Sequence, residues 1–257
     1  MDISDMPLKA VKQLLAESPS AELAELLKAD GRKSVQALYK SYERMQKEKE
    51  RVAGLYTYEN ECRARGHELV AGVDEVGRGP LAGPVVVAAV ILPPNCFIEK
   101  INDSKKLSEK TREKLYDIIM EKAVAVNRAV LDEKTIDRIN IYQASMNGMY
   151  EAVYGLSVKP QEVLIDAMPL NHLDIPSQSI VKGDAKSASI AAASIIAKVT
   201  RDRMMDEFDK QYPQYGFAKN KGYGTAEHLA ALRQYGSCEI HRRSFEPIKS
   251  MVNFGGI

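Results

Sequence analysis

The amino-acid sequence predicts an α/β fold in which helices flank a mixed β-sheet, with a helical N-terminal extension and a helical C-terminal region. Short apolar runs that end at carboxylates or turn residues alternate with longer helical patterns between residues 67 and 211. The 257 residues are 45% hydrophobic and 28% charged, which is typical of a globular chain with a sizeable core. We therefore expect two parts, a helical extension over residues 1–66 and a main domain over residues 67–257.

The extension contains helical patterns throughout. Ser20 is a candidate N-cap for a second helix, which we expect Gly31 to end. Residues 34–65 form a long, charged segment with glycine only at Gly54, and this pattern predicts a further helix. Because no residues here have catalytic spacing, we expect this part to serve packing or partner contact. The first helix places four apolar side chains on one face, namely Leu8, Val11, Leu14 and Leu15.

The main domain begins with two apolar runs joined by a glycine-rich loop, and further runs and helical patterns follow it. The last helix carries a face of small residues, which allows close approach to a sheet. In order, the predicted elements are strands at 69–75, 84–92 and 123–131, with a helix capped by Ser108 before the third strand, then a helix at 133–156, strands at 163–166 and 179–184, and a helix at 187–211.

Composition excludes several classes of protein. No apolar run approaches the roughly 20 residues of a membrane helix, and the N-terminus lacks the basic-then-apolar layout of a signal peptide. Cys62, Cys96 and Cys238 are odd in number and widely spaced, which disfavours a disulfide framework or a zinc knuckle. We expect a cytoplasmic monomer without membrane contact.

The distribution of charge indicates a possible polyanion partner, although the net charge is only +1. Residues 67–181 have a net charge of −4 from 12 basic and 16 acidic residues, and residues 182–257 have +4 from 12 basic and 8 acidic residues. An acidic centre with a basic flank suits a metal site beside a groove for a polyanion. Ordinary uneven surface charge would give the same counts.

Carboxylates stand at the ends of three predicted strands. Asp74 and Glu75 end the first, and Asp166 and Asp184 end the later runs. Neighbouring side chains in a strand point to opposite faces, so Asp74 and Glu75 could converge on one cation only where the chain bends into the loop. Oxygen ligands without a histidine or cysteine cluster suit Mg²⁺ or Mn²⁺. Two such ions can activate water and stabilise the leaving oxygen in phosphoryl transfer.

The glycine-rich loop has Gly77, Gly79 and Gly83, a spacing superficially like that of a dinucleotide-binding turn. That turn requires a helix directly after the glycines, whereas here a second strand is expected from Pro84. The remaining functional interpretation is close approach of the loop backbone to a nucleic-acid strand, with exposed amides and Arg78 as donors.

Seven blocks resemble, in order, the signature of the type 2 ribonuclease H family, in particular ribonuclease HII. Together they span roughly residues 56–250 and leave the first 55 residues outside the resemblance. The blocks are residues 74–84, 103–108, 164–167, 182–187, 192–203, 221–225 and 241–245.

The resemblance implies an RNase H-like fold and metal-dependent cleavage of the RNA strand in RNA–DNA hybrids. It also implies incision on the 5′ side of a ribonucleotide embedded in duplex DNA, with 3′-hydroxyl and 5′-phosphate ends, as in ribonucleotide excision repair and DNA replication. By position, Asp74, Glu75, Asp166 and Asp184 would be the catalytic carboxylates and would bind two Mg²⁺ or Mn²⁺ ions.

The resemblance also implies substrate-binding residues. A 2′-hydroxyl distinguishes RNA from DNA, so residues around it would set specificity. The candidates are Gly77, Arg78 and Gly79 around the 2′-hydroxyl, Tyr223 against the sugar on the DNA side of the junction, and Lys105, Lys182 and Lys186 at phosphates.

Some alternatives stay open on the sequence alone. Ribonuclease HIII shares the first block but usually carries a larger, sheet-containing N-terminal domain. A noncatalytic hybrid-binding protein would not need four acids. A phosphatase or exonuclease would not need the loop and the tyrosine that recognise the junction.

Two single residues also have more than one interpretation. Asp202 could be a fifth ligand, but we expect it to pair with the neighbouring arginines. His241, beside two arginines, is expected to contact phosphate or to pack.

Overall fold

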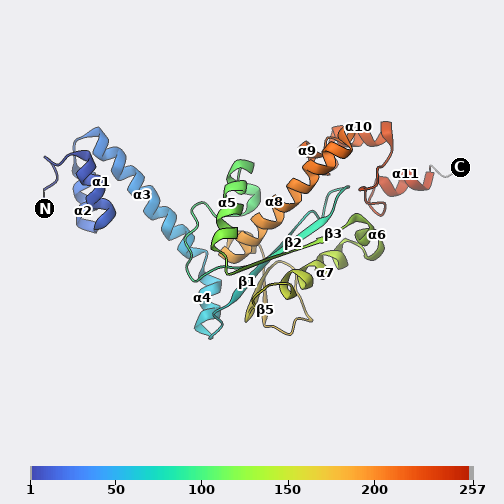
Figure 1. Cartoon of the computed structure of the whole chain (residues 1–257), viewed down its shortest axis with the longest axis horizontal. Helices are drawn as coiled ribbons and strands as arrows, with labels where there is room; N and C mark the ends of the chain where they lie inside the picture. Colours follow the sequence, from blue (N-terminus) through green and yellow to red (C-terminus); the bar gives the residue numbers. More distant parts are fainter. Residues whose placement is uncertain (1, 255–257) are drawn as a thin grey trace. The chain divides into compact units, whose positions relative to one another are not determined.

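The computed structural model describes residues 2–254 of the chain (Figure 1). The chain divides into two compact units, Met1–Ala53 and Gly54–Ile257. Each unit has its own apolar cluster, so each is described by itself.

The N-terminal unit contains α1 (Leu8–Glu17), α2 (Ala21–Ala29) and nearly all of α3 (Lys33–Gly54). As expected, Ser20 caps α2, because its hydroxyl accepts the amide of Leu23 at 3.1 Å. The helix ends one residue earlier than predicted, with Asp30 as its C-cap in place of Gly31. The small core of this unit consists of Ile3, Val11, Leu15, Leu23, Leu27 and Val35.

The second unit is built on a mixed sheet of five strands in the order β3-β2-β1-β4-β5, which confirms the predicted fold class. The central strand β1 is antiparallel to β2 and parallel to β4; β2 is antiparallel to β3, and β4 is parallel to β5. The strands are β1 (Val70–Val76), β2 (Val85–Ile91), β3 (Ala125–Leu131), β4 (Glu162–Asp166) and β5 (Ser177–Ile180).

Two helices cover opposite faces of this sheet, as Figure 1 shows: α8 (Ala188–Gln211) and α7 (Ile141–Tyr154). The alternation of side chains along β1 assigns the faces, because Ala71 and Val73 share a core cluster with residues of α7. Gly72, between them, faces α8 so closely that a Cβ atom there would lie 2.1 Å from the carbonyl carbon of Ser189. The predicted close approach of the small-residue face of α8 to the sheet is therefore confirmed.

Two long helical predictions were wrong in the same way, because each pattern continues across a break in the backbone. The predicted helix 133–156 is α6 (Glu133–Ile139) followed by α7. Asn140 lies between them at φ 66°, and its side chain accepts the amide of Gln143 at 3.0 Å. Likewise, residues 34–65 form α3 and then α4 (Thr57–Ala64).

Of the remaining elements, η1 and α5 lie between β2 and β3, η2 lies between β5 and α8, and the others follow α8 in the chain. The α-helices are α5 (Glu109–Lys122), α9 (Phe217–Asn220), α10 (Ala226–Tyr235) and α11 (Ile248–Phe254), and the 3₁₀ turns are η1 (Ser104–Lys106), η2 (Gly183–Ala185) and η3 (Pro213–Tyr215).

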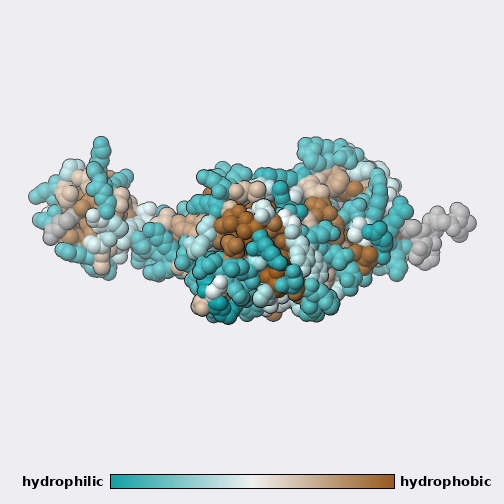
Figure 2. Space-filling view, turned by 60° about the horizontal axis from the view of Figure 1, so that its bottom comes forward, coloured by the Kyte–Doolittle hydropathy of each residue, from teal (hydrophilic) through white to brown (hydrophobic). Residues whose placement is uncertain are grey.

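The surface is mainly hydrophilic, with apolar patches on the face seen in Figure 2. Within residues 2–254, no helix combines the length and the apolar character needed to cross a membrane. The large apolar side chains that are exposed are Met120, Val124, Val130, Tyr142, Tyr154, Val181, Tyr223 and Tyr235.

Candidate active site

Strand β1 places Asp74 and Glu75 on opposite faces of the sheet. Both residues are paired with β2, Asp74 opposite Ala88 and Glu75 opposite Val87, and the strand continues to Val76. The bend that would let both side chains converge on one cation does not occur at these two residues, because pairing with β2 keeps the backbone extended past them. Asp74 lies on the α8 face.

Three of the predicted carboxylates come together on that face. Asp74, Asp166 and Asp184 each offer one oxygen, and the three oxygens lie within 4.8 Å of one another. Asp166 ends β4, which is parallel to β1, so the carboxyl ends of the two strands meet at one edge of the sheet. Asp184 lies in η2, and the Gly183 amide before it donates to Oδ1 of Asp166 at 2.7 Å. Two central strands and one turn therefore build the cluster.

Glu75 lies outside this group of three, on the other face of β1. Its Oε1 atom is 3.4 Å from the Arg78 guanidinium, while its Oε2 atom is buried and has no hydrogen-bond partner among the described residues. A buried carboxylate oxygen without a donor is costly, so this atom has unused capacity to bind a cation.

The electrostatics of the cluster favour a bound cation. Burial, followed by the charge of Glu75, raises the pKa of Asp74 well above its usual range, and burial raises the pKa of Glu75 to about 7. Burial, Asp103 and Asp166 raise the pKa of Asp184. These carboxylates repel each other in a poorly solvated place, and a divalent cation would relieve that repulsion.

The donor set fits a hard metal ion. It consists of carboxylate oxygens, without the nitrogen or sulfur donors that select zinc. Lys105, in η1, is close enough to take part: burial lowers its pKa, but the charges of Asp74 and Asp184 outweigh this and raise it.

The sequence analysis missed a serine pair that fixes Asp74. Ser194, counted only among the small residues of α8, hydrogen-bonds the Asp74 carboxylate. Its hydroxyl lies 2.8 Å from that of Ser104, and both serines are buried. Arg112 donates to the carbonyl oxygens of Ser104 (3.2 Å) and Leu107 (2.6 Å), which attaches η1 to α5. The positions of Lys105 and Asp74 are thus coupled through α8.

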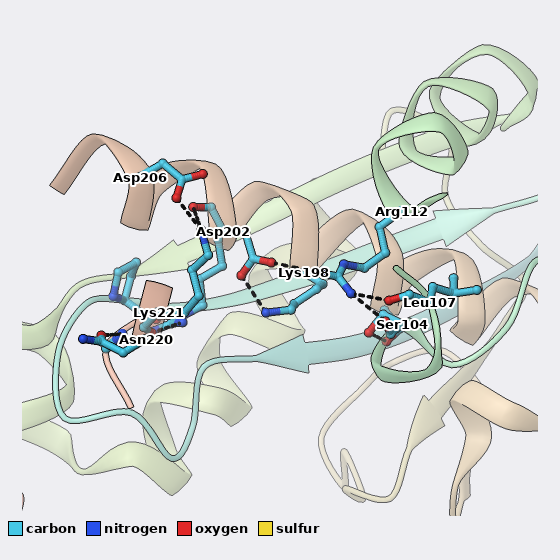
Figure 3. A network of polar contacts seen from close by, with 12 residues as sticks. Ser104, Leu107, Arg112, Lys198, Asp202, Asp206, Asn220 and Lys221 are labelled. Carbon is cyan, nitrogen blue, oxygen red and sulfur yellow. Dashed lines mark hydrogen bonds and ion pairs between the residues drawn. The ribbon is translucent and has the colours of Figure 1, made fainter. Parts of the chain in front are cut away.

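Asp202 belongs to a polar network along α8, drawn in Figure 3. Its carboxylate pairs with Lys198 at 2.6 Å and with Arg112 at 3.5 Å, so the predicted pairing with neighbouring arginines was wrong. Residues one apart on a helix point in different directions, whereas residues four apart share a face. Further along the same helix, Asp206 pairs with Lys221.

Two buried arginines hold the glycine-rich loop. Arg201 donates to the carbonyl oxygens of Ala82 (3.0 Å), Pro84 (2.9 Å) and Lys221 (2.8 Å). Arg242 donates to the carbonyl oxygens of three further loop residues, Gly77, Arg78 and Gly83. In the sequence, Arg201 and Arg242 belong to two of the blocks that resemble the family signature, residues 192–203 and 241–245. No local pattern could show that their side chains bind the carbonyl oxygens of the loop.

Arg201 also brings Tyr223 to the loop. The amide of Leu81 donates to the carbonyl of Gly222 at 2.8 Å, which attaches the two segments directly. The Tyr223 side chain is 47% exposed, and a Cβ atom built on Gly79 would lie 3.7 Å from Cε1 of its ring. The structure thus brings together the loop and the tyrosine that the sequence singled out.

The three candidate lysines are exposed near the carboxylates. Lys182, at φ 58°, precedes η2 and Lys186 follows it, so the two flank Asp184 along the chain. His241, in contrast, is 1% exposed and packs against Tyr215 and Phe217. The expectation of packing is confirmed, and phosphate contact by this side chain is ruled out by burial.

Glu59 of α4 is another residue that the sequence analysis missed. One carboxylate oxygen accepts the Ser187 hydroxyl at 2.6 Å and the Ser189 amide at 2.9 Å. These groups form the start of α8, just after the turn that carries Asp184. A carboxylate is favourable at a helix N-terminus, so Glu59 stabilises the helix end beside the cluster.

Comparisons with known proteins agree on one family. A family model described as ribonuclease HII matches residues 71–248, and one described as the ribonuclease HII N-terminal domain matches residues 7–63. Ribonuclease HII from Bacillus cytotoxicus is 53% identical over 251 residues, covering 95% of this chain and 96% of the relative.

Solved structures agree on the fold. The ribonuclease H2 structure from Pyrococcus horikoshii OT3 matches with a TM-score of 0.63 and 28% identity, covering 73% of this chain and 99% of the other. The Mn²⁺ complex of Bst-RNase HIII matches with a TM-score of 0.55 and 20% identity, covering 74% and 71%, and supports the fold alone.

The N-terminal match corrects one expectation. The first 55 residues were placed outside the resemblance, yet most of them lie within the N-terminal domain of the same family. Their helical patterns carry no catalytic motif, which is why the residues alone did not reveal the relationship.

Proposed function

The chain belongs to the ribonuclease HII family, and on this premise we propose that it incises duplex DNA on the 5′ side of an embedded ribonucleotide and hydrolyses the RNA strand of RNA–DNA hybrids. Membership makes it an enzyme, a type 2 ribonuclease H endonuclease. The observation that carries the proposal is the group of Asp74, Asp166 and Asp184 oxygens within 4.8 Å of one another.

We propose that Asp74, Glu75, Asp166 and Asp184 hold two Mg²⁺ or Mn²⁺ ions. The proposal is supported by the all-oxygen donor set, by the raised pKa values and by the unpartnered Oε2 atom of Glu75. When bound, such ions supply Lewis-acid activation of water and of the phosphate. Ser194 and the Gly183 amide keep Asp74 and Asp166 oriented toward the cluster.

The bond to be broken follows from the proposed products. A water oxygen bonds to the phosphorus, and the bond from phosphorus to the 3′ oxygen of the preceding nucleotide breaks. The phosphate then stays on the 5′ side of the ribonucleotide, and the preceding nucleotide ends in a 3′-hydroxyl. In this reaction the side chains orient the phosphate and water and need not act as nucleophiles.

Recognition of the junction is assigned to the loop and the tyrosine. Gly77, Arg78 and Gly79 would contact the ribonucleotide around its 2′-hydroxyl, and the exposed ring of Tyr223 would pack on the next sugar, which belongs to DNA. The support is the juxtaposition of Gly79 and Tyr223 and the fixation of both segments by Arg201. A closely held pair of this kind can discriminate a sugar with a hydroxyl from one without.

Phosphates on either side of the junction need positive partners. The candidates are the exposed side chains of Lys105, Lys182 and Lys186, because η1 contains Lys105, and Lys182 and Lys186 flank the η2 turn that carries Asp184. Lysine contacts of this kind give affinity without sequence specificity and weaken with salt.

The remaining proposals concern the cellular setting. We place the enzyme in ribonucleotide excision repair and DNA replication, in the cytoplasm and as a monomer. Residues 67–257 would carry the activity, and residues 1–66 would form an accessory part that contacts nucleic acid or a partner. Deletion of residues 2–53 tests that role, which fails if neither hybrid affinity nor stability changes.

The test of function is incision of a DNA duplex that holds one ribonucleotide, with Mg²⁺ or Mn²⁺. Wild type should cut once, 5′ to the ribonucleotide; Asp74→Asn should abolish the cut and Tyr223→Ala should weaken it. Cleavage only of longer hybrids would instead indicate ribonuclease HIII-type activity. Folded, metal-loaded protein that binds hybrids without cutting either substrate would leave a noncatalytic hybrid-binding protein.

A further inference from the structure

Two buried histidines form a hydrogen-bonded pair behind the tyrosine that faces the glycine-rich loop. The Nε2 atoms of His228 and His241 lie 3.0 Å apart, and both residues are at most 1% exposed. Nδ1 of His228 lies 2.9 Å from the carbonyl oxygen of Tyr223, and Nδ1 of His241 lies 2.9 Å from the backbone nitrogen of Cys238. The four residues form one continuous chain of hydrogen bonds that ends at Tyr223.

The two ends of this chain fix where the protons lie. The Tyr223 carbonyl can only accept, so Nδ1 of His228 carries a proton and its Nε2 accepts. The Cys238 amide can only donate, so Nδ1 of His241 accepts and its Nε2 carries the proton. Each end independently requires the same central bond, in which His241 donates to His228. The two neutral rings therefore have opposite tautomers.

Burial keeps the pair neutral. It lowers the pKa of His228, and together with the neighbouring His228 ring it lowers the pKa of His241 to about 4. Burial also raises the pKa of the Cys238 thiol to about 11, so the sulfur 3.1 Å from Nδ1 of His241 keeps its proton. An added proton on either ring would set two N–H groups against each other.

Aromatic side chains hold the rings in place. Tyr215 lies edge-on to His241 at 4.9 Å between ring centroids, and Phe217 lies edge-on to His228 at 5.4 Å. Such contacts restrict ring rotation, so the direction of the hydrogen bonds is maintained.

The Tyr223 backbone is the fixed end of this device. Its carbonyl accepts from His228 and also from the Thr225 amide at 2.8 Å, so both lone pairs are used. Thr225 in turn caps α10 by accepting the His228 amide at 3.3 Å. The side chain, in contrast, is 47% exposed and faces Gly79. Because the Tyr223 backbone is anchored, the direction in which its side chain leaves the backbone is fixed, while the ring remains partly accessible to a substrate.

We propose that His228 is a positioning residue for Tyr223. Its Nδ1 proton, whose place is set by the hydrogen bonds through His241 to Cys238, holds the backbone carbonyl of Tyr223. The Tyr223 ring then stays beside Gly79, where it contacts the DNA sugar at the junction. The inference rests on the proposed function, because it assigns a role within substrate recognition. The carboxylates lie outside this chain of hydrogen bonds, so the effect falls on substrate binding.

Two substitutions at His228 separate positioning from filling of space. Asparagine can place its amide nitrogen where Nδ1 was and keep the bond to Tyr223, whereas glutamine reaches toward His241 and loses it. For the single-ribonucleotide duplex, His228→Gln should raise KM about fivefold to tenfold with kcat little changed, as expected for one lost hydrogen bond. His228→Asn should recover most of the loss. Equal damage by both variants, or no change with His228→Gln, overturns the proposal.

A double-mutant cycle tests whether the effect passes through Tyr223. In the Tyr223→Ala background, which still presents the backbone carbonyl but lacks the ring, His228→Gln should have no further effect on KM. Additive effects would overturn the proposal. His172→Gln, which changes an exposed histidine between β4 and β5, serves as the control.

The proton positions can be checked without activity. Nitrogen-15 NMR should show one buried histidine protonated at Nδ1 and one at Nε2, and two Nε2-protonated or charged rings would overturn the proposal. Wild type that fails to incise the duplex while showing these tautomers would refute the proposed function. Incision by wild type together with an unaffected His228→Gln variant would refute only the positioning role.

Discussion

The Arg201 guanidinium donates to the carbonyl of Lys221 at 2.8 Å. Because the same group also binds the carbonyls of Ala82 and Pro84, one buried side chain joins the glycine-rich loop to the segment that presents Tyr223. The two segments are about 140 residues apart in sequence. Their alignment at the proposed site of ribonucleotide recognition therefore depends on Arg201, a buried residue that does not contact the clustered carboxylates.

Replacement of Arg201 by lysine should therefore damage both stability and recognition. Lysine keeps the charge but cannot reach three carbonyls in two segments, and a buried charge with missing partners costs about 3–5 kcal/mol. Urea unfolding should show this loss, and KM for a ribonucleotide-containing duplex should rise. The matched control is Arg203→Lys on the same helix, because Arg203 is exposed and pairs with Glu113 at the surface. Equal stability of the two variants would contradict the assignment.

Gly72 should tolerate no side chain, because a Cβ atom there would meet the α8 backbone at 2.1 Å from Ser189 and 2.2 Å from Ile190. Gly72→Ala should push α8 away from the sheet and destabilise the fold by several kcal/mol, roughly as other overpacked core substitutions do or more. Thermal melting measures the effect. Gly54→Ala is the control, since nothing lies within 4 Å of a Cβ atom at that glycine, and a melting temperature of Gly72→Ala near that of the control would disprove the close packing.

The contribution of Glu75 to the stability of the metal-free protein should fall as pH rises from about 5 to 8. Burial raises the pKa of Glu75 to about 7 from an ordinary value near 4.5. A carboxyl with a raised pKa binds its proton more tightly in the folded state than in the unfolded state. Its stabilising contribution is therefore lost as pH rises from the unfolded-state pKa through the folded-state pKa, by up to about 3 kcal/mol. Denaturant unfolding in EDTA at several pH values measures this. The lowered pKa values of the buried His228 and His241 act in the opposite direction, so the quantity to compare is the difference in unfolding free energy between wild type and Glu75→Gln. That difference should fall as pH rises, and a difference that stays constant with pH would contradict the assignment.

Divalent cations should stabilise the protein at pH 8, because they neutralise the same carboxylates. A ligand present at 100 times its Kd raises the free energy of unfolding by about 2.7 kcal/mol, which should appear as a higher melting temperature in Mg²⁺ or Mn²⁺. Asp184→Asn should reduce the shift, since it removes one of the three clustered oxygens. Asp174→Asn, at an exposed carboxylate, is the control, and an equal shift in Asp184→Asn and wild type would place the ion elsewhere.

The sequence alone determined which residue types form the site and which elements carry them. Apolar runs that ended at Asp74 and Asp166 predicted strand ends. The parallel pairing of β1 with β4, together with the η2 turn that carries Asp184 after β5, brought the three carboxylates together. Strands were predicted to within a few residues, because alternation and burial are local properties of the chain. The small residues of α8 likewise predicted its close approach to the sheet, which the structure shows at Gly72.

Tertiary structure decided the features that depend on the meeting of distant segments. Pairing of β1 with β2 set Asp74 and Glu75 on opposite faces, and the left-handed backbone at Asn140 broke a helix whose apolar pattern ran on without interruption. The loop contacts of Arg201 and the chain of hydrogen bonds from Cys238 to Tyr223 have no sequence signature, because a buried donor finds its acceptor through the fold and not through spacing along the chain.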